Sequence, residues 1–464
     1  MKVLLIFPRY KIWNTPTQMP LGIGYIASTL LKEGIDVKIL DLMAEEPEVL
    51  EEVLKSFKPE LAGISSTTPQ IKTSWEVAGK IKKISPSTVV MIGGVHVTAL
   101  PEESLAVPEV DLVARGEGEE TVLDFCRNFA PRENWSNVLG ISYKDGNGQV
   151  VHNDPRPLIK DVDNIPLPAF HLFNTSRYSI TQPLIDRQTK ESRAFYITTS
   201  RGCPYNCVYC FKGVYGQTWR PRSAENVVAE WDFLVNEMGA TEIGVQDDVF
   251  NLKLDRAKQI CRLLIEKKLN RVPWIINNGM RLDIVDDELM ALMKESGCKR
   301  VAFGVESGDI QIRKVIGKPF TEEQIQYAFR LAKKHKLMTS GFFMFGNPYE
   351  NKETMEKTIK FAVKINPQIA HFTIATPFPS TGLYKYISEN GKFLTTDWND
   401  YGLLEGHALF SAGELTPELM VKMWHKAYRS FYLRPQRVVK EILTPANWLK
   451  IPKLVRAASR YFIK

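Results

Sequence analysis

The sequence predicts an α/β chain of two parallel-sheet domains followed by a helical C-terminal region. Short apolar segments alternate with segments of helical periodicity over residues 1–145, and the alternation returns with six strand segments over residues 191–385. Such alternation is typical of parallel strands joined by right-handed helical crossovers. We therefore expect a doubly wound, Rossmann-like domain and then a partial (β/α)6 barrel, because six units fall short of the eight in a closed barrel.

The first domain shows five short apolar segments separated by segments of helical periodicity. The expected strands are KVLLIF, DVKILDL, LAGISS, TVVMIGG and the start of DLVARGEGEE, with helices over 21–33, 47–57, 74–84 and 121–129. Ligands of doubly wound sheets bind at the carboxyl ends of the strands. Those ends hold Ser65, Ser66, Thr67, Gly93, Gly94, Gly116 and Gly118.

Residues 146–190 contain turn signals such as DGNG and HNDPRP and are expected to form a linker or a small hairpin excursion. The barrel strands that follow are AFYITT, TEIGVQ, WIINN, RVAFGV, TSGFFMF and AHFTIATPF, and its helices are expected over 224–238, 254–267, 286–296, 322–335 and 352–365. Residues 386–464 are expected to be mainly helical. Thr416 is a cap and Pro417 a first-turn residue for a helix over 417–431, and a short basic helix is expected over 447–464.

The composition is that of a globular chain, with 464 residues, 44% hydrophobic and 24% charged. Neither an eighteen-residue apolar run nor a cleavage site after the N-terminal apolar run is present, so we expect a cytoplasmic protein. The chain has 60 basic and 53 acidic residues. Residues 434–464 contain eight of the basic residues and only one acidic residue. The excess charge thus belongs to the tail, and the body gives no reason to expect nucleic-acid binding.

Three of the six cysteines lie in one loop, CPYNCVYC, directly after the strand YITTS: Cys203, Cys207 and Cys210. Thiolates at this spacing suit an iron–sulfur cluster, whereas a structural zinc site needs a fourth ligand. The next cysteine and histidine, Cys261 and His335, are distant, so zinc completed by a remote residue is the alternative. A four-iron cluster held by three cysteines leaves one iron open. The dispersed Cys126, Cys261 and Cys298 are expected to be core thiols.

The cysteine motif and the later strand ends resemble the radical S-adenosylmethionine (radical SAM) superfamily. The resemblance implies that the three loop cysteines bind a 4Fe–4S cluster whose open iron takes the amino and carboxylate groups of SAM. It implies reductive cleavage of SAM to a 5′-deoxyadenosyl radical, with electrons from an external donor such as flavodoxin or ferredoxin. The loop GNPYE departs from the superfamily's commoner glycine, isoleucine, glycine spacing. The implied SAM contacts are Tyr209, Asp247 with its neighbour Asp248, Gly304, Glu306, Ser307 and Gly346.

Most of residues 1–128 resemble the cobalamin-binding module that precedes many such barrels. The matching stretches are PLGIGYIASTLLKEG, KILD, GISSTT, GGVHVT and RGEGEET. The Asp-x-His-x-x-Gly pattern that gives cobalt a histidine is absent, and His96 lies in another loop, where a backbone-bonding or core role is expected. Cobalamin should therefore bind without its own base or a protein histidine. The implied cobalamin contacts are Ser65, Ser66, Thr67, Gly93, Gly94, Gly116, Glu117, Gly118 and Glu119.

Together these resemblances imply a cobalamin-dependent radical SAM methyltransferase that acts on an unactivated carbon. One SAM would form methylcobalamin and a second would supply the radical that removes hydrogen from a small-molecule substrate. One alternative is an oxidative cyclase or rearrangement enzyme without net methylation, on a tetrapyrrole-like or lipid substrate. The other is a non-catalytic cobalamin or SAM sensor. A methylthiotransferase is disfavoured, because that class needs three further N-terminal cysteines and Cys126 is alone there.

The tail NWLKIPKLVRAASRYFIK places apolar residues at helical spacing, with basic residues on the other faces. A basic amphipathic helix of this kind can lie on an anionic membrane surface, as a peripheral contact at the inner face. In that case the substrate is expected to be a lipid or another apolar molecule. The alternative is a terminal helix that packs its apolar face on the barrel and exposes its charges to water.

Overall fold

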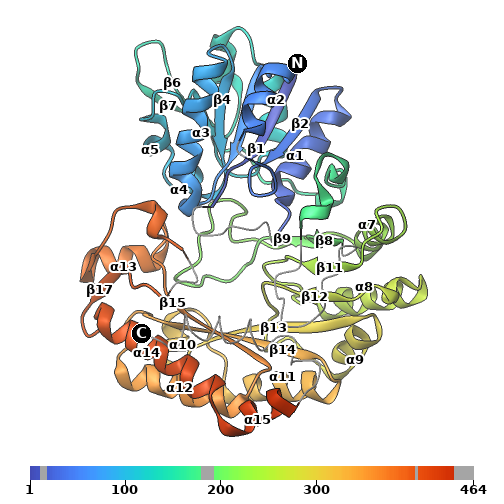
Figure 1. The fold of residues 1–464 in the computed structure, drawn as a ribbon, viewed down its shortest axis with the longest axis vertical. Coiled ribbons are helices and arrows are strands. Elements are labelled where there is room, and N and C mark those ends of the chain that lie inside the picture. The colour runs from blue at the N-terminus through green and yellow to red at the C-terminus, as the bar shows by residue number, and fades with distance from the viewer. Residues whose placement is uncertain (11–17, 47, 179–192, 403–405, 444–464) are drawn as a thin grey trace.

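The structure, a computed structural model, describes residues 1–10, 18–46, 48–178, 193–402 and 406–443. Figure 1 shows an N-terminal α/β domain in blue, a curved open sheet in green to orange, and C-terminal helices in red against that sheet. None of the helices in these ranges has the length and apolar content needed to cross a membrane. The basic tail over 447–464 lies outside the described residues, so both readings of it stay open.

The first domain has the predicted parallel sheet with helices on both faces. Along β1, Val3 and Leu5 join the core that includes α1 and α6, whereas Leu4 and Ile6 join the core under α2 and α3. This alternation is what a strand buried on both faces requires. The sheet order is β2-β1-β3-β4-β5-β6-β7. The strands are β1 (Lys2–Phe7), β2 (Asp36–Asp41), β3 (Leu61–Ser65), β4 (Val89–Gly93), β5 (Leu112–Ala114), β6 (Ile141–Lys144) and β7 (Val150–His152).

The helices of this domain are α1 (Leu21–Lys32), α2 (Val49–Phe57), α3 (Ile71–Ile84), α4 (Val95–Ala99), α5 (Pro101–Leu105) and α6 (Glu119–Arg127). Strands β1 to β5 are parallel, and β6 and β7 extend the sheet as an antiparallel hairpin. Strand β7 thus lies past residue 145, in the segment expected to be a linker or a small hairpin excursion. Three single-turn 3-10 helices follow within 162–177, and residues 179–192 lie outside the description.

The second sheet consists of six parallel strands in the order β15-β14-β13-β12-β11-β8. Because β8 and β15 are both edge strands, the barrel is open, as predicted. The strands are β8 (Ala194–Ile197), β11 (Glu242–Val245), β12 (Trp274–Ile276), β13 (Cys298–Glu306), β14 (Met338–Phe345) and β15 (Ile369–Ile374). A separate antiparallel pair, β9 (Ser200–Arg201) and β10 (Arg220–Pro221), joins the two ends of the cysteine-containing segment.

The barrel helices begin where side-chain caps stand in the sequence. Ser223, Asp286, Thr321 and Asn351 each accept a hydrogen bond from a backbone N–H in the first turn that follows. Such caps satisfy backbone donors that the helix itself leaves unpaired. The helices are α7 (Ala224–Asn236), α8 (Leu254–Glu266), α9 (Asp287–Glu295), α10 (Ile310–Val315), α11 (Glu322–Lys334) and α12 (Lys352–Ile365).

The C-terminal region contains α13 (Gly382–Asn390), α14 (Pro417–Tyr432) and α15 (Pro435–Leu443), with the antiparallel pair β16 (Gly391–Phe393) and β17 (Phe410–Ala412) between them. Thr416 caps α14, as the sequence indicates. Between β16 and β17, the Trp398 Nε1 donates to Glu103 Oε1 at 2.7 Å, and Asp397 pairs with Lys72 at 3.0 Å. These contacts attach the C-terminal region to the first domain.

Candidate functional site

A cavity of about 1490 Å³ lies between the first domain and the barrel. It is lined by the carboxyl ends of β3, β4 and β5, by the cysteine loop and by residues inside the barrel. Pockets for drug-sized ligands are about 300–1,000 Å³, so this one has room for more than a small substrate. Both parallel sheets thus direct their carboxyl ends, where α/β folds bind ligands, into one space.

The cysteine loop forms part of the cavity wall, and neighbouring elements hold its backbone. Val208 N donates to Ile316 O at 3.3 Å, and Leu383 N donates to Val208 O at 2.7 Å. A Cβ on Gly317 would lie 2.7 Å from Asn206 O, so only glycine allows this close approach. The loop is therefore anchored between the end of α10 and the start of α13.

The three loop cysteines line the cavity together and fit an iron–sulfur cluster. The Cys207 and Cys210 thiols hydrogen-bond each other, which lowers the pKa of Cys207 and raises that of Cys210. Within the described ranges, no three His, Cys, Asp or Glu side chains converge to hold one metal ion. A four-iron cluster takes its cysteines on separate irons, whereas a structural zinc ion binds all of its ligands itself.

The other three cysteines lie away from the cavity, as expected of core thiols. All six cysteines are free of disulfides. Burial raises the pKa of each remaining thiol well above its usual value, so all three stay protonated at neutral pH and are poor metal ligands. These residues are Cys126, Cys261 and Cys298.

Beside the loop, a second set of predicted residues meets at the carboxyl end of β13. The Tyr209 hydroxyl is buried without a hydrogen-bond partner, and burial and the Glu306 carboxylate raise its pKa. Glu306 accepts from Lys318 Nζ at 2.6 Å and has a left-handed backbone with φ of +62°. A Cβ on Gly304 would lie 2.6 Å from both groups of that pair. Tyr209, Gly304, Glu306 and Lys318 all line the cavity.

Of the adjacent aspartates, Asp248 lines the cavity and Asp247 does not. Asp247 Oδ1 accepts from Thr199 N at 2.5 Å, and Oδ2 accepts from Ser200 Oγ at 2.6 Å. Burial raises the pKa of Asp247 and these bonds oppose the rise. Asp247 therefore fixes the end of β8, while Asp248 accepts a backbone bond from Gly202 beside Cys203.

Ser307 and Gly346 also lie outside the cavity lining. The Ser307 hydroxyl is 3.2 Å from Thr358 Oγ1, in the buried contact between β13 and α12. Gly346 has φ of +86°, and a Cβ there would lie 2.9 Å from Met420 Sδ. Gly346 thus allows α14 to pack close to the end of β14. The loop GNPYE, which departs from the superfamily's usual spacing, therefore contacts a helix in this chain.

The nine residues predicted to contact cobalamin all line the first-domain side of the cavity. A Cβ on Gly93 would meet nothing closer than 3.8 Å, and one on Gly116 nothing closer than 4.0 Å. Both glycines therefore border open space that a large ligand could occupy. The Ser66 and Thr67 hydroxyls already bond within the protein, to Ser74 at 2.8 Å and Gln70 at 2.7 Å.

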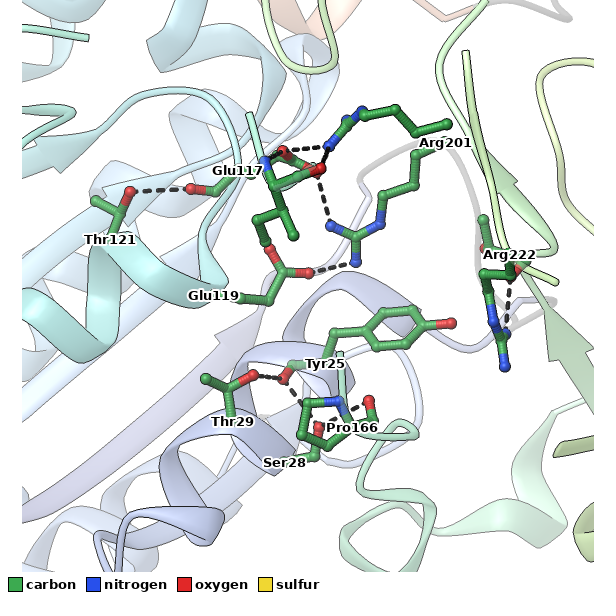
Figure 2. Close-up of polar contacts among 12 residues, drawn as sticks. Tyr25, Ser28, Thr29, Glu117, Glu119, Thr121, Pro166, Arg201 and Arg222 are labelled. Atoms are coloured by element: carbon green, nitrogen blue, oxygen red, sulfur yellow. Dashed lines mark hydrogen bonds and ion pairs between the residues drawn. The ribbon is translucent and has the colours of Figure 1, made fainter. Parts of the chain in front are cut away.

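Glu117 and Glu119 belong to a buried ion network that joins the two domains (Figure 2). Arg201 Nη1 pairs with Glu117 at 2.8 Å and its Nη2 with Glu119 at 2.5 Å, and Arg220 pairs with Glu117 at 2.8 Å. The guanidinium of Arg201 also lies 5.1 Å from the centre of the Tyr25 ring. The sequence pattern places both glutamates near the ligand but carries no sign of these arginine partners.

His96 is fully buried away from the cavity. Its Nε2 lies 2.9 Å from Glu103 Oε2, and its ring packs edge-on against Trp398 at 5.3 Å. Within the described part of the first domain, no histidine lines the cavity. His96 thus has the core role expected from the sequence.

Four polar residues inside the barrel also line the cavity, and the sequence analysis did not single them out: Asn277, Arg300, Ser340 and His371. Their position within largely apolar strands could have indicated them as cavity residues. Examples are the arginine of CKRVAFGVE and the histidine of IAHFTI.

Two protein-family models match the chain. The B12 binding domain matches residues 16–125, and the Radical SAM superfamily matches residues 197–362. The first match covers the strand ends beside Gly93 and Gly116, and the second begins at the end of β8 and includes the cysteine loop.

Curated relatives match over most of their length. The chain is 36% identical to an uncharacterized methyltransferase of Pyrococcus horikoshii, over 100% of this chain and 99% of the relative. It is 30% identical to the cytidylyl-2-hydroxyethylphosphonate methyltransferase of Streptomyces wedmorensis, over 84% and 82%. It is 27% identical to the anaerobic magnesium-protoporphyrin IX monomethyl ester cyclase of Cereibacter sphaeroides, over 94% and 71%.

Among solved structures, the cobalamin-dependent S-adenosylmethionine radical enzyme OxsB matches with a TM-score of 0.77. The match covers 99% of this chain and 72% of that one, at 19% identity. At this identity the likeness is one of fold, and it extends over both domains and the C-terminal region.

Proposed function

Because this chain belongs to the cobalamin-binding radical SAM family, we propose that it is a methyltransferase that acts on an unactivated carbon of a small molecule. The observation that carries the proposal is the single cavity, in which the cysteine loop faces the glycine-rich strand ends of the first domain. Two cofactors bound at these opposite walls would meet over a shared substrate. The names of two relatives, the methyltransferases of Pyrococcus horikoshii and Streptomyces wedmorensis, support the same activity.

The residues present would hold the three cofactors of the family at distinct places. Cys203, Cys207 and Cys210 would bind the 4Fe–4S cluster, and the strand ends at Gly93 and Gly116 would border cobalamin. When bound, the cluster with SAM supplies one-electron chemistry that removes hydrogen from carbon, and cobalamin supplies a methyl group.

The SAM contacts proposed from the structure differ in part from those expected from the sequence. Tyr209 offers a buried hydroxyl with no protein partner, and the Glu306–Lys318 pair offers a carboxylate and an ammonium at the cavity wall. Asp248 is proposed in place of Asp247, because the Asp247 oxygens already accept bonds from Thr199 and Ser200, in the segment after β8. Each of these groups can bond an ammonium, a carboxylate or a ribose hydroxyl.

An oxidative cyclisation without methylation is the second candidate, since a cyclase is among the relatives. The two activities differ in the fate of the SAM methyl group. We would incubate the holoenzyme anaerobically with reductant, methyl-labelled SAM and a small-molecule extract of the source cells. A methyltransferase gives a labelled product heavier than its substrate by about fourteen mass units, as addition of CH2 requires, plus the extra mass of the label. A cyclase gives an unlabelled product that has lost hydrogen.

The proposed enzyme needs an external one-electron donor, such as flavodoxin or ferredoxin, and a reducing compartment. Free cysteines throughout the chain suit the cytoplasm, where thiols stay reduced. We propose no nucleic-acid partner. Contact of the basic tail with a membrane surface is a separate proposal, tested below.

A further inference from the structure

The barrel end of the cavity is polar where barrel interiors are ordinarily packed with apolar side chains. Asn277, Arg300, Ser340 and His371 come from the end of β12 and from β13, β14 and β15, which are neighbours in the sheet. Arg300 is 4% exposed and Ser340 is 1% exposed. Polar groups removed from water cost free energy unless they are hydrogen-bonded, so a polar cluster around a cavity suggests a ligand.

Two hydrogen-bonding atoms in this cluster have no protein partner. Ser340 Oγ and Asn277 Nδ2 are both buried without one. Asn277 Oδ1 accepts a bond from Arg300 Nη2 at 3.3 Å, which orients the guanidinium beside them. The cluster therefore presents a cation, a hydroxyl and an amide N–H2 at one place.

The charge of the cluster is that of a single cation. Burial and the nearby Arg300 lower the pKa of His371 to about 4, so this imidazole is neutral at physiological pH. Its ring stacks on Phe342 at 5.1 Å, and Phe342 also lines the cavity. A monoanion matches the one formal charge of the guanidinium, whereas a dianion would bring a second negative charge into the cavity.

Arg300 lies near the start of β13 and Glu306 at its end, a backbone separation of about 20 Å at roughly 3.3 Å per residue. The Arg300 guanidinium reaches from there to Asn277, directly after the carboxyl end of β12. Arg300 and Glu306 line the same cavity. A ligand held at Arg300 would thus extend toward the cofactor end.

We propose that Arg300, with Asn277 and Ser340, binds a singly charged oxyanion of the substrate, a carboxylate in its simplest form. This inference rests on the proposed function, because it assigns the barrel end of the same cavity to the substrate. The guanidinium is suited to the role, since its planar N–H groups match the two oxygens of a carboxylate.

The test is binding of a matched acid and amide to the full-length holoenzyme under anaerobic conditions. The probes are 3-phenylpropionate, 3-phenylpropionamide and inorganic phosphate, with dissociation constants from equilibrium dialysis. We expect the acid to bind at least about tenfold more tightly than the amide, because only the acid gains charge-assisted bonds. Arg300→Met should remove that preference, and Ser340→Ala should weaken acid binding several-fold.

Lys299→Met is the matched control, because Lys299 precedes Arg300 on β13 and is exposed on the opposite face. It removes the same charge and should leave both constants unchanged. Equal binding of acid and amide to the native chain, or no binding of the acid, would overturn the proposal. An equal loss of acid affinity in Arg300→Met and in the control Lys299→Met would also overturn it. Tighter binding of phosphate than of the acid would overturn the single-charge assignment.

The folded state of each variant is checked by circular dichroism and iron content. If Arg300→Met does not fold, Ser340→Ala and the acid–amide comparison on the native chain decide the question. Methyl transfer is measured on the same preparations. If the native chain prefers the acid but transfers no methyl group, the proposed function is refuted and the oxyanion subsite is retained. If it transfers a methyl group but does not prefer the acid, the subsite is refuted and the proposed function is retained.

Discussion

Replacement of Arg201 by methionine tests the ion network that joins the two domains. The side chains of Arg201, Glu117 and Glu119 are 7%, 4% and 7% exposed. In the variant, Glu117 keeps its ion pair with Arg220, whereas Glu119 loses the ion pair it makes with Arg201. A carboxylate would then be buried at the interface without that cation.

The size of the effect follows from burial. Removal of one partner from a buried ion pair costs about 3–5 kcal/mol, because the remaining charge stays out of water. An unfolding entropy of about 2.1 cal/mol/K per residue makes 1 kcal/mol worth about 1 °C in a chain of 464 residues, so the unfolding midpoint should fall by about 3–5 °C. Addition of Glu119→Gln removes the stranded charge, so the double variant should be more stable than Arg201→Met alone, with a coupling of about 0.5–3 kcal/mol.

The assay is thermal unfolding of the native chain, the two single variants and the double variant, followed by circular dichroism. Arg127→Met is the control, because Arg127 pairs with Glu33 across the surface at 59% and 40% exposure. Exposed pairs of this kind contribute at most about 1 kcal/mol. If Arg201→Met costs no more than Arg127→Met, or if the two network substitutions are additive, the buried network does not stabilise the interface.

Three further predictions concern the cluster, the cobalt and the tail. Alanine at any loop cysteine should abolish the bound iron and its visible absorbance. The control Cys126→Ala should retain about four irons per chain, since Cys126 lies outside the cavity. A tetrahedral zinc ion without iron in the native chain would contradict this prediction. The reduced paramagnetic cobalt of bound cobalamin should show no nitrogen hyperfine splitting in the native chain or in His96→Ala, because His96 is buried against Trp398. Splitting that is present in the native chain and lost in His96→Ala would make His96 the cobalt ligand. The full chain should sediment with anionic vesicles more than a chain truncated after Thr444, because truncation removes most of the tail's basic residues; equal sedimentation of the two would remove membrane contact.

The sequence predicted the elements that depend on local pattern. All six barrel strands and the helix over 417–431 follow apolar runs and caps, and the structure contains each of them. The cysteine motif indicated the superfamily because its spacing is specific, and the matching family model confirms it. Strand β7 lies in the segment expected to be a linker or a small hairpin excursion, and with three residues it is too short to show a clear alternation.

The site was predictable only in part, because contacts between distant residues decide what each side chain does. Glu117 and Glu119 line the cavity as expected, yet Arg201, 84 residues beyond Glu117, pairs with both carboxylates. Asp247 and Asp248 are adjacent, and only the turn after β11 decides which faces the cavity. Arg300 lies in a strand whose apolar pattern hides an inward-facing charge.

The most direct test of the central claim is the balance of SAM products during turnover. The holoenzyme, supplied with reductant, labelled SAM and its substrate under anaerobic conditions, should form S-adenosylhomocysteine and 5′-deoxyadenosine in about equal amounts per methylated product. The expectation follows because a cobalamin-dependent radical methylation consumes SAM in two different ways. Formation of 5′-deoxyadenosine alone, with no label in any product, would contradict the account and favour cyclisation or rearrangement.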